Sequence, residues 1–238
     1  MNTASAAWLI VTFALAVIAG AFLLVLRIFA RMVIGLTHSV GHVRDVNLSP
    51  EGDRITLRSN AFTRAQGEYA LWWDERRGRA LIGRTLREDP RAKTVEREVL
   101  RSTGTAAAPG THGDWNGFVF SGPEDLGLDW SDVTIATENG PAPAWHFPGD
   151  TDTWVIHVHG IRVSRLSPLR GVPVFAREGY HSLVISYRGD GEAPPVEGGH
   201  STLGVAEWPD LEPAIDYALH NGARRILLCG WSMGGGMV

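Results

Sequence analysis

The feature that most constrains this chain is a serine set between glycines directly after a short apolar run. The run is Arg225-Ile226-Leu227-Leu228-Cys229, and Gly230-Trp231-Ser232-Met233-Gly234-Gly235 follows it. An apolar run of this length predicts a buried strand. The pattern Gly-x-Ser-x-Gly after a strand predicts a sharp turn into a helix that holds the serine side chain outward. A serine exposed in this way is a candidate nucleophile.

The residues before this run support the same interpretation. Apolar side chains recur at helical spacing at Leu211, Ala214, Ile215, Ala218 and Leu219, which predicts a helix with one apolar stripe facing a sheet. Pro213 fits only the first turn of a helix, so the helix is expected to begin near Asp210. Strand, helix and turn together predict a βαβ unit that ends on Ser232.

From about Leu128 onward the chain resembles the α/β-hydrolase superfamily, and more closely bacterial membrane-anchored members with a β-rich segment before the hydrolase fold. The resemblance rests on His157-Val158-His159-Gly160, Ser186-Tyr187-Arg188-Gly189-Asp190, Glu207-Trp208, Asp210-Leu211 and the Ser232 turn. It implies a serine esterase, lipase, thioesterase or peptidase. The expected fold is α/β: the N-terminal half of an α/β-hydrolase sheet, preceded by a transmembrane helix and a small β-rich segment.

In this resemblance Ser232 is the nucleophile, and His159-Gly160 forms the loop that completes an oxyanion hole. Acyl transfer needs two backbone N–H groups aimed at the oxygen that becomes negative, and these are assigned to Met233 and Ile161. The acid and the histidine of the catalytic triad follow the serine in this fold. None of the six residues after Ser232 is Asp, Glu or His. We therefore expect the chain to be an N-terminal part, a fragment with little or no hydrolytic activity by itself.

Other candidate ligands are few. His157 and His159 would point to one side of a strand, but no third ligand occurs at a fitting spacing, so neither a metal nor a cofactor is expected. His157 is expected to be a satisfied core histidine, and His159 to hydrogen-bond within its own loop. Asp190 and Glu192 are expected to stabilise a turn, with contact to substrate as the alternative.

The N-terminus predicts a membrane anchor. Residues 1–26 carry no charge, and residues 6–26 are almost wholly apolar. At 1.5 Å per residue this stretch reaches about 31 Å, the thickness of a hydrocarbon core. A cleaved signal peptide would need a positive first region and a shorter apolar core, and a buried core helix would be shorter too. We expect an anchor over 1–32, spanning at 6–26, with lipid as its partner. Arg27 and Arg31 after the span place the globular part in the cytoplasm.

The rest of the chain divides into a linker and β-rich extension, 33–125, and the hydrolase-like domain, 126–238. Alternation at 54–58, and in part at 96–100, predicts strands. The segments 69–73 and 79–83 flank a polar turn at 74–78, which predicts a hairpin. A net charge of −4 gives no reason to expect nucleic acid as a partner, and a small acyl substrate or a peptide is expected instead. The alternative to an enzyme is a non-catalytic membrane-anchored binding or interaction module that keeps a partial hydrolase fold.

Overall fold

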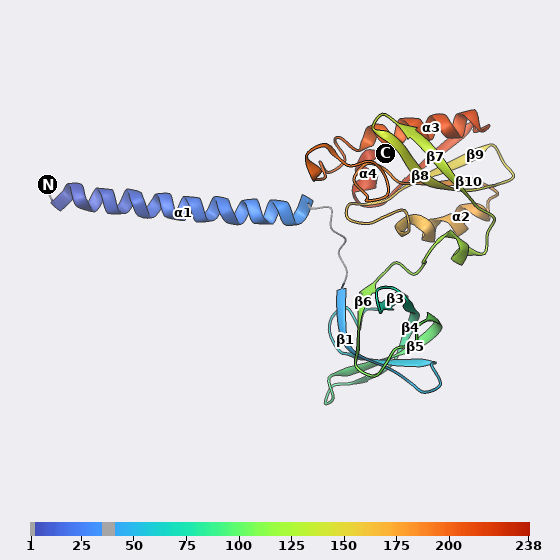
Figure 1. Ribbon diagram of the computed structural model, residues 1–238, viewed down its shortest axis with the longest axis horizontal. Coiled ribbons are helices and arrows are strands. Elements are labelled where there is room, and N and C mark those ends of the chain that lie inside the picture. Colours follow the sequence, from blue (N-terminus) through green and yellow to red (C-terminus); the bar gives the residue numbers. More distant parts are fainter. Residues whose placement is uncertain (1–2, 35–40) are drawn as a thin grey trace.

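The computed structural model describes residues 3–34 and 41–238 (Figure 1). Residues 35–40, at the start of the predicted linker and β-rich extension, lie outside the described residues, as do residues 1–2 of the predicted anchor. Helix α1 (Thr3–Ile34) comes first, a closed barrel of strands follows, and a five-stranded sheet with its helices forms the rest.

The predicted membrane anchor is wrong. We expected a span over residues 6–26, and a span needs about 20 consecutive apolar residues. Within the residues that the structure describes, no helix combines the length and the apolarity needed to cross a membrane. The prediction of a single-pass membrane localisation rested on residues 1–32, and it is wrong for the same reason.

Residues 41–116 form a closed antiparallel barrel. Its strands are β1 (Gly41–Leu48), β2 (Arg54–Arg58), β3 (Tyr69–Trp73), β4 (Gly78–Asp89), β5 (Thr94–Gly104) and β6 (Thr111–Asn116), in the order β1-β2-β5-β4-β3-β6. The predicted hairpin across 74–78 is confirmed, since β3 pairs with β4. The sheet closes because β6 pairs with both β1 and β3, which leaves no free edge. Alternate side chains fill the interior, among them Val46, Ile55, Leu71, Ile82 and Val95.

One charged side chain lies inside this barrel. Arg97 of β5 is fully buried, and its guanidinium donates to the carbonyl oxygens of Ala65 at 2.8 Å, Gly67 at 2.6 Å and Gly83 at 2.9 Å. It also lies over the rings of Tyr69 and Trp115, at 5.3 and 5.4 Å. Arg97 therefore links the loop before β3 to the barrel by hydrogen bonds. Its N–H donors are paired with backbone carbonyl oxygens and not with a carboxylate.

The second unit is a mixed sheet. It contains β7 (Ser131–Thr137), β8 (Gly140–Phe147), β9 (Thr153–Val158), β10 (His181–Ile185) and β11 (Arg225–Gly230), in the order β11-β9-β10-β8-β7. Strand β9 runs parallel to β10 and β11, whereas β8 is antiparallel to β7 and β10. The helices are α2 (Val172–Ala176), α3 (Leu211–His220) and α4 (Met233–Met237), and short 3-10 turns occur at η1 (Pro123–Leu126), η2 (Ser167–Gly171), η3 (Glu197–Gly199) and η4 (Trp208–Asp210).

The expected fold class is therefore corrected. In place of a transmembrane helix, a small β-rich segment and half of a hydrolase sheet, the structure has a closed six-stranded barrel and a five-stranded mixed sheet. The physical reason lies in long-range pairing, which closes β6 onto β1 and sets β8 antiparallel to β10. The apolar stripe of α3 is confirmed at Leu211, Ala214 and Ala218, which are buried, whereas Leu219 is half exposed.

The segment that joins the two units is held from both sides. Arg79 of β4 donates to Ser121 Oγ at 2.7 Å, to Asp125 Oδ2 at 2.8 Å and to the carbonyl oxygen of Val119. From the other unit, Arg170 donates to the carbonyl oxygen of Gly117. Both arginines therefore hydrogen-bond to the same short connection between the barrel and the sheet.

Asp125 makes this junction sensitive to acid. Burial opposes its ionisation, but hydrogen bonds from Ser121 and from Arg79 outweigh that effect and lower the pKa of Asp125 from 3.8 to about 2. Since the folded-state pKa is depressed, the carboxylate stabilises the fold above about pH 4, and the stabilisation is lost as the pH falls toward 2. At roughly 1.4 kcal/mol per pKa unit the effect is about 2 kcal/mol.

We expect Asp125→Asn to unfold at lower urea than the wild type at pH 7, and the difference to shrink as the pH falls from 4 to 2. Urea titrations at several pH values, followed by circular dichroism, measure it. Asp129→Asn is the control, because Asp129 is exposed. An equal gap between Asp125→Asn and wild type at pH 7 and pH 2 would contradict the assignment.

Candidate active site

Ser232 occupies a strained turn between β11 and α4. Its backbone angles are φ 53° and ψ −117°, a conformation that residues other than glycine rarely adopt. The turn is held on both sides, because Trp231 N–H donates to Val158 O and Gly235 N–H donates to Ser232 O, each at 2.9 Å. The serine side chain is exposed. Strain of about 1–3 kcal/mol persists only where the surroundings enforce it, and it concentrates at functional sites.

Gly230 and Gly234, which flank Ser232, lie so close to other backbone atoms that a side chain would not fit at either position. A Cβ on Gly230 would lie 2.6 Å from the Cα of Gly235, and a Cβ on Gly234 would lie 2.6 Å from the carbonyl oxygen of His159. Real Cβ atoms do not approach other atoms so closely. The two glycines therefore permit the turn that places Ser232, as the motif predicts.

The His159-Gly160 loop lies directly against the serine. Strands β9 and β11 are parallel neighbours with Gly230 opposite Val158, so the turns that follow them meet. A Cβ on Gly160 would lie 3.1 Å from Ser232 Cβ and 3.7 Å from Ser232 Oγ. The structure thus brings Ser232, Gly160 and the adjoining Ile161 and Met233 together. Among the residues that the structure describes, the backbone N–H groups of Ile161 and Met233 donate no turn or loop hydrogen bond to another backbone carbonyl oxygen.

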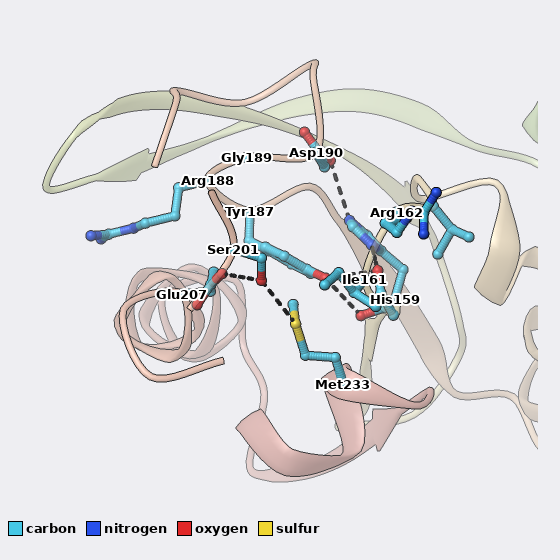
Figure 2. A pocket seen from close by; sticks show the side chains of 12 residues that line it. His159, Ile161, Arg162, Tyr187, Arg188, Gly189, Asp190, Ser201, Glu207 and Met233 are labelled. Atoms are coloured by element: carbon cyan, nitrogen blue, oxygen red, sulfur yellow. Dashed lines mark hydrogen bonds and ion pairs between the residues drawn. The ribbon is translucent and has the colours of Figure 1, made fainter. Parts of the chain in front are cut away.

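His159 holds this loop in place (Figure 2). Its Nδ1 lies 2.8 Å from Gly160 O and its Nε2 lies 3.2 Å from Asp190 Oδ2. The ring stacks on Tyr187 with centroids 4.1 Å apart, and the Tyr187 hydroxyl donates to the carbonyl oxygens of His159 and Gly160, at 3.0 Å each. Because oxygens of other groups face both ring nitrogens, His159 positions the loop and is not aimed at the Ser232 proton.

The pKa values of Asp190 and Tyr187, the two side chains that contact His159, are shifted from their ordinary values. Burial opposes ionisation of Asp190, but hydrogen bonding and charge from His159, with bonds from Ser186 and the Ala193 N–H, keep the pKa of Asp190 below its ordinary value. Burial raises the pKa of Tyr187, and the nearby carboxylates of Asp190 and Glu207 raise it further. Tyr187 therefore remains a neutral donor, and Asp190 remains a carboxylate, at neutral pH.

A second carboxylate organises the loop over α4. Glu207 is buried and accepts hydrogen bonds from Ser201 Oγ at 2.7 Å, Thr202 N–H at 2.9 Å and Gly204 N–H at 3.0 Å. Burial opposes its ionisation, but hydrogen bonds from the hydroxyl groups of Thr202 and Ser201 and from the Thr202 N–H outweigh burial and lower the pKa of Glu207. Ser201 Oγ lies 3.4 Å from Met233 Sδ. The loop is thereby fixed beside the residue that follows the nucleophile.

The space enclosed by these groups is small. Figure 2 shows the side chains of His159, Tyr187, Ser201 and Met233 converging on a cavity of about 10 Å³, the size of a single water molecule. Ser232 is not among the residues that line this cavity.

His157 in β9 and His159 directly after this strand have different surroundings. His157 is fully buried, its Nε2 lies 3.2 Å from Ser182 Oγ, and its Nδ1 has no partner in the described part of the chain. Burial lowers the pKa of His157 to about 4. No group of three or more potential metal ligands occurs among the described residues.

The sequence missed the groups that support the loop. Asp190 does stabilise a turn, accepting from the N–H groups of Glu192 and Ala193 at 2.9 and 2.8 Å, but its bond to His159 was not expected. The motifs that contain Tyr187 and Glu207 predict no role for either side chain. A signal exists for Tyr187 and Asp190, because both follow the buried strand β10 closely, whereas Glu207 lies in the loop before α3 and follows no strand.

A family match covers only the barrel of this chain. Residues 42–116, within the barrel, match a family described as "Domain of unknown function (DUF8805)". Among curated proteins, none matches the chain.

Similarity to solved structures is partial. An esterase from Pyrococcus furiosus is 29% identical over 49% of this chain and 47% of that chain, with a TM-score of 0.42. An alpha-beta hydrolase from Vibrio vulnificus is 22% identical over 48% and 39%, with a TM-score of 0.39. An acylaminoacyl peptidase from Pyrococcus horikoshii is 13% identical over 85% and 34%, with a TM-score of 0.37. The chain spans about half the length of the Pyrococcus furiosus esterase.

Proposed function

We propose that Ser232 is the nucleophile of a serine hydrolase that acts on an acyl ester, thioester or amide. The observation that carries the proposal is the backbone of Ser232, a non-glycine residue at φ 53° and ψ −117°. The His159-Gly160 loop against its side chain supplies the second half of the argument. Strain alone has many causes, but strain at an exposed serine beside backbone N–H groups suits acyl transfer.

The proposed steps follow from this geometry. Ser232 Oγ attacks the acyl carbonyl carbon, and the electron pair of the carbonyl moves to its oxygen. The backbone N–H groups of Met233 and Ile161 stabilise that negative oxygen, and each such donor contributes about 3 kcal/mol. Collapse of the tetrahedral species expels the alcohol, thiol or amine with a proton, and water then releases the acid from the acyl-serine. A small acyl compound or a peptide fits this chemistry.

The proton of Ser232 needs a base. Among the residues that the structure describes, none hydrogen-bonds to Ser232 Oγ, and His159 is engaged elsewhere. The proposal therefore assigns no base from these residues, and low activity of the chain by itself remains our prediction.

The same observation favours one other candidate, a non-catalytic module that keeps the turn as a binding surface. The two differ in the reactivity of Ser232. A fluorophosphonate reacts with a serine whose oxyanion donors stabilise the pentacoordinate phosphorus, whereas a merely exposed serine reacts at the background rate.

We expect fluorophosphonate to phosphonylate Ser232 in the folded chain at least about 100 times faster than in the urea-unfolded chain. Intact-protein mass and peptide mapping measure the adduct. Ser232→Ala should abolish it, and Ser131→Ala, which removes an exposed serine of β7, should leave it unchanged. Equal labelling in the folded and unfolded chains would favour the binding module.

A further inference from the structure

Both ring nitrogens of His159 face oxygen atoms that can only accept hydrogen bonds (Figure 2). Nδ1 lies 2.8 Å from the backbone carbonyl oxygen of Gly160, and Nε2 lies 3.2 Å from Oδ2 of the Asp190 carboxylate. A neutral imidazole carries one N–H group and one bare nitrogen, which accepts but does not donate. A neutral His159 would therefore set a lone pair against one of these two oxygens. The geometry fits a ring with a proton on each nitrogen, which is the imidazolium cation.

The surroundings of this ring suit a cation beside an anion. The side chains of His159 and Asp190 are 1% and 0% exposed, and a buried charge is stable only with a partner and hydrogen bonds. Oδ1 of Asp190 accepts from the backbone N–H groups of Glu192 and Ala193, at 2.9 and 2.8 Å. The Tyr187 ring stacks on the imidazole with centroids 4.1 Å apart, and the face of an aromatic ring attracts a cation. Each member of the pair is thus supported in its charged form.

The other charged side chains around the pair have interactions of their own. Three of them line the same cavity as His159: Arg162, Arg188 and Glu207. Arg188 pairs with Asp210 at 2.5 Å. Glu207 accepts hydrogen bonds from its own loop, and Arg162 also interacts within the protein. Glu192, close to Asp190 in the chain, pairs with Arg165, and helix α4 contributes no charged side chain. Asp190 is therefore the counter-ion of His159.

The cation acts on the peptide group that joins Gly160 to Ile161. The oxygen of this group accepts from His159 Nδ1 at 2.8 Å and from the Tyr187 hydroxyl at 3.0 Å. In a planar trans peptide the C=O and N–H bonds point in opposite directions. Two donors that hold the oxygen therefore also fix the direction of the Ile161 N–H. A charged donor binds the oxygen more strongly than a neutral one does, and it polarises the peptide so that its N–H donates more strongly in turn.

We propose that His159 is an imidazolium cation at neutral pH and the positioning residue for the oxyanion donor at Ile161, with Asp190 holding its second proton in place. The ring does not touch the reacting atoms and acts through the Gly160–Ile161 peptide group. The effect on the oxyanion rests on the proposed hydrolase function, whereas the charge of His159 does not depend on it.

Nitrogen NMR of the whole chain with isotope-labelled histidine tests the charge directly at pH 7, because protonated and bare ring nitrogens resonate in separate regions. We expect two protonated nitrogens for His159, assigned by their loss in His159→Gln. His157 is the internal reference. Burial lowers its pKa to about 4, so it should show one protonated and one bare nitrogen in the same spectrum. A bare nitrogen on His159 would overturn the proposal.

Asp190→Asn tests the consequence for the site. Asparagine keeps the oxygen that accepts from the turn but removes the negative charge, so His159 should lose its second proton at pH 7. Fluorophosphonate labelling of Ser232 should then slow at least about tenfold, because the oxyanion donor is no longer held in place. Glu138→Gln is the control, since it removes a carboxylate that is 81% exposed. It should change neither the spectrum of His159 nor the labelling rate.

Two results with Asp190→Asn would overturn the proposal: a His159 that keeps both protons, or an unchanged labelling rate. Circular dichroism shows whether the variant is folded, and the spectrum of the wild type decides the charge of His159 without any substitution. If the wild type shows a doubly protonated His159 but Ser232 is never labelled, the hydrolase proposal fails and the charge assignment is confirmed. The two proposals therefore fail in different measurements.

Discussion

Replacing Gly234 by alanine is expected to destabilise the sheet unit by about 3 kcal/mol or more and to abolish labelling of Ser232. The new Cβ would lie 2.6 Å from His159 O and 2.9 Å from Val158 C. Both atoms belong to the backbone at the end of β9, which cannot move aside as a flexible side chain would. The strain can be relieved only by separating α4 from β9, and this displaces Ser232 from the His159-Gly160 loop.

The matched control is two residues away in the same helix. A Cβ on Gly236 meets no atom within 4 Å, so Gly236→Ala should leave stability unchanged or raise it by up to about 1 kcal/mol through helix propensity. Urea unfolding followed by tryptophan fluorescence compares the two variants, and fluorophosphonate labelling reports on the turn. Equal midpoints for Gly234→Ala and Gly236→Ala would show that the close approach at Gly234 does not constrain the turn.

Replacing Arg97 by methionine is expected to cost about 3–5 kcal/mol and to loosen the barrel. The guanidinium donates to the carbonyl oxygens of Thr63, Ala65, Gly67 and Gly83. Methionine fills similar space but donates nothing, and each buried acceptor left unpaired costs about 1–3 kcal/mol. The loss of the contacts with the rings of Tyr69 and Trp115 adds to this.

Arg87→Met is the control for Arg97. Arg87 is on β4, its side chain is 73% exposed, and its nearest carboxylate is 3.9 Å away, so its replacement should change stability by less than about 0.5 kcal/mol. Arg97→Lys should lie between the two, because three donors on one nitrogen cannot reach four separated carbonyl oxygens. Thermal unfolding of the three variants measures the order of their stabilities. If Arg97→Met were as stable as Arg87→Met, the buried guanidinium would not organise the barrel.

The local features could be predicted from the sequence because each depends on neighbours in the chain. The turn at Ser232 follows from glycines at fixed spacing, and the buried stripe of α3 follows from helical periodicity at Leu211, Ala214 and Ala218. The loop after β9 could be associated with Ser232 because the carboxyl ends of parallel strands meet at one edge of a sheet. The roles assigned to Ile161 and Met233 stay predictions.

The features that sequence reasoning missed depend on contacts between distant segments. Closure of the barrel requires β6 to pair with β1 and β3, and no local pattern specifies that pairing. Arg97 lies in a stretch whose alternation suggested a strand, but its burial follows from carbonyl oxygens about 30 residues earlier. The bonds of His159 to Asp190 and of Tyr187 to the His159-Gly160 loop join different strand ends. The apolar N-terminus suggested a membrane span that the described residues do not support.

The central claim is that the turn makes Ser232 a nucleophile with oxyanion donors in place, and boron NMR with phenylboronic acid tests it most directly. Ser232 Oγ would add to the trigonal boron and release its proton to water. The resulting tetrahedral boronate places an oxygen where the oxyanion forms, and no bond to a leaving group has to break. We predict a tetrahedral boron signal with the folded chain that disappears in Ser232→Ala and in Gly234→Ala. Boron that stays trigonal with the folded chain, or a tetrahedral signal that persists in Ser232→Ala, would contradict the claim.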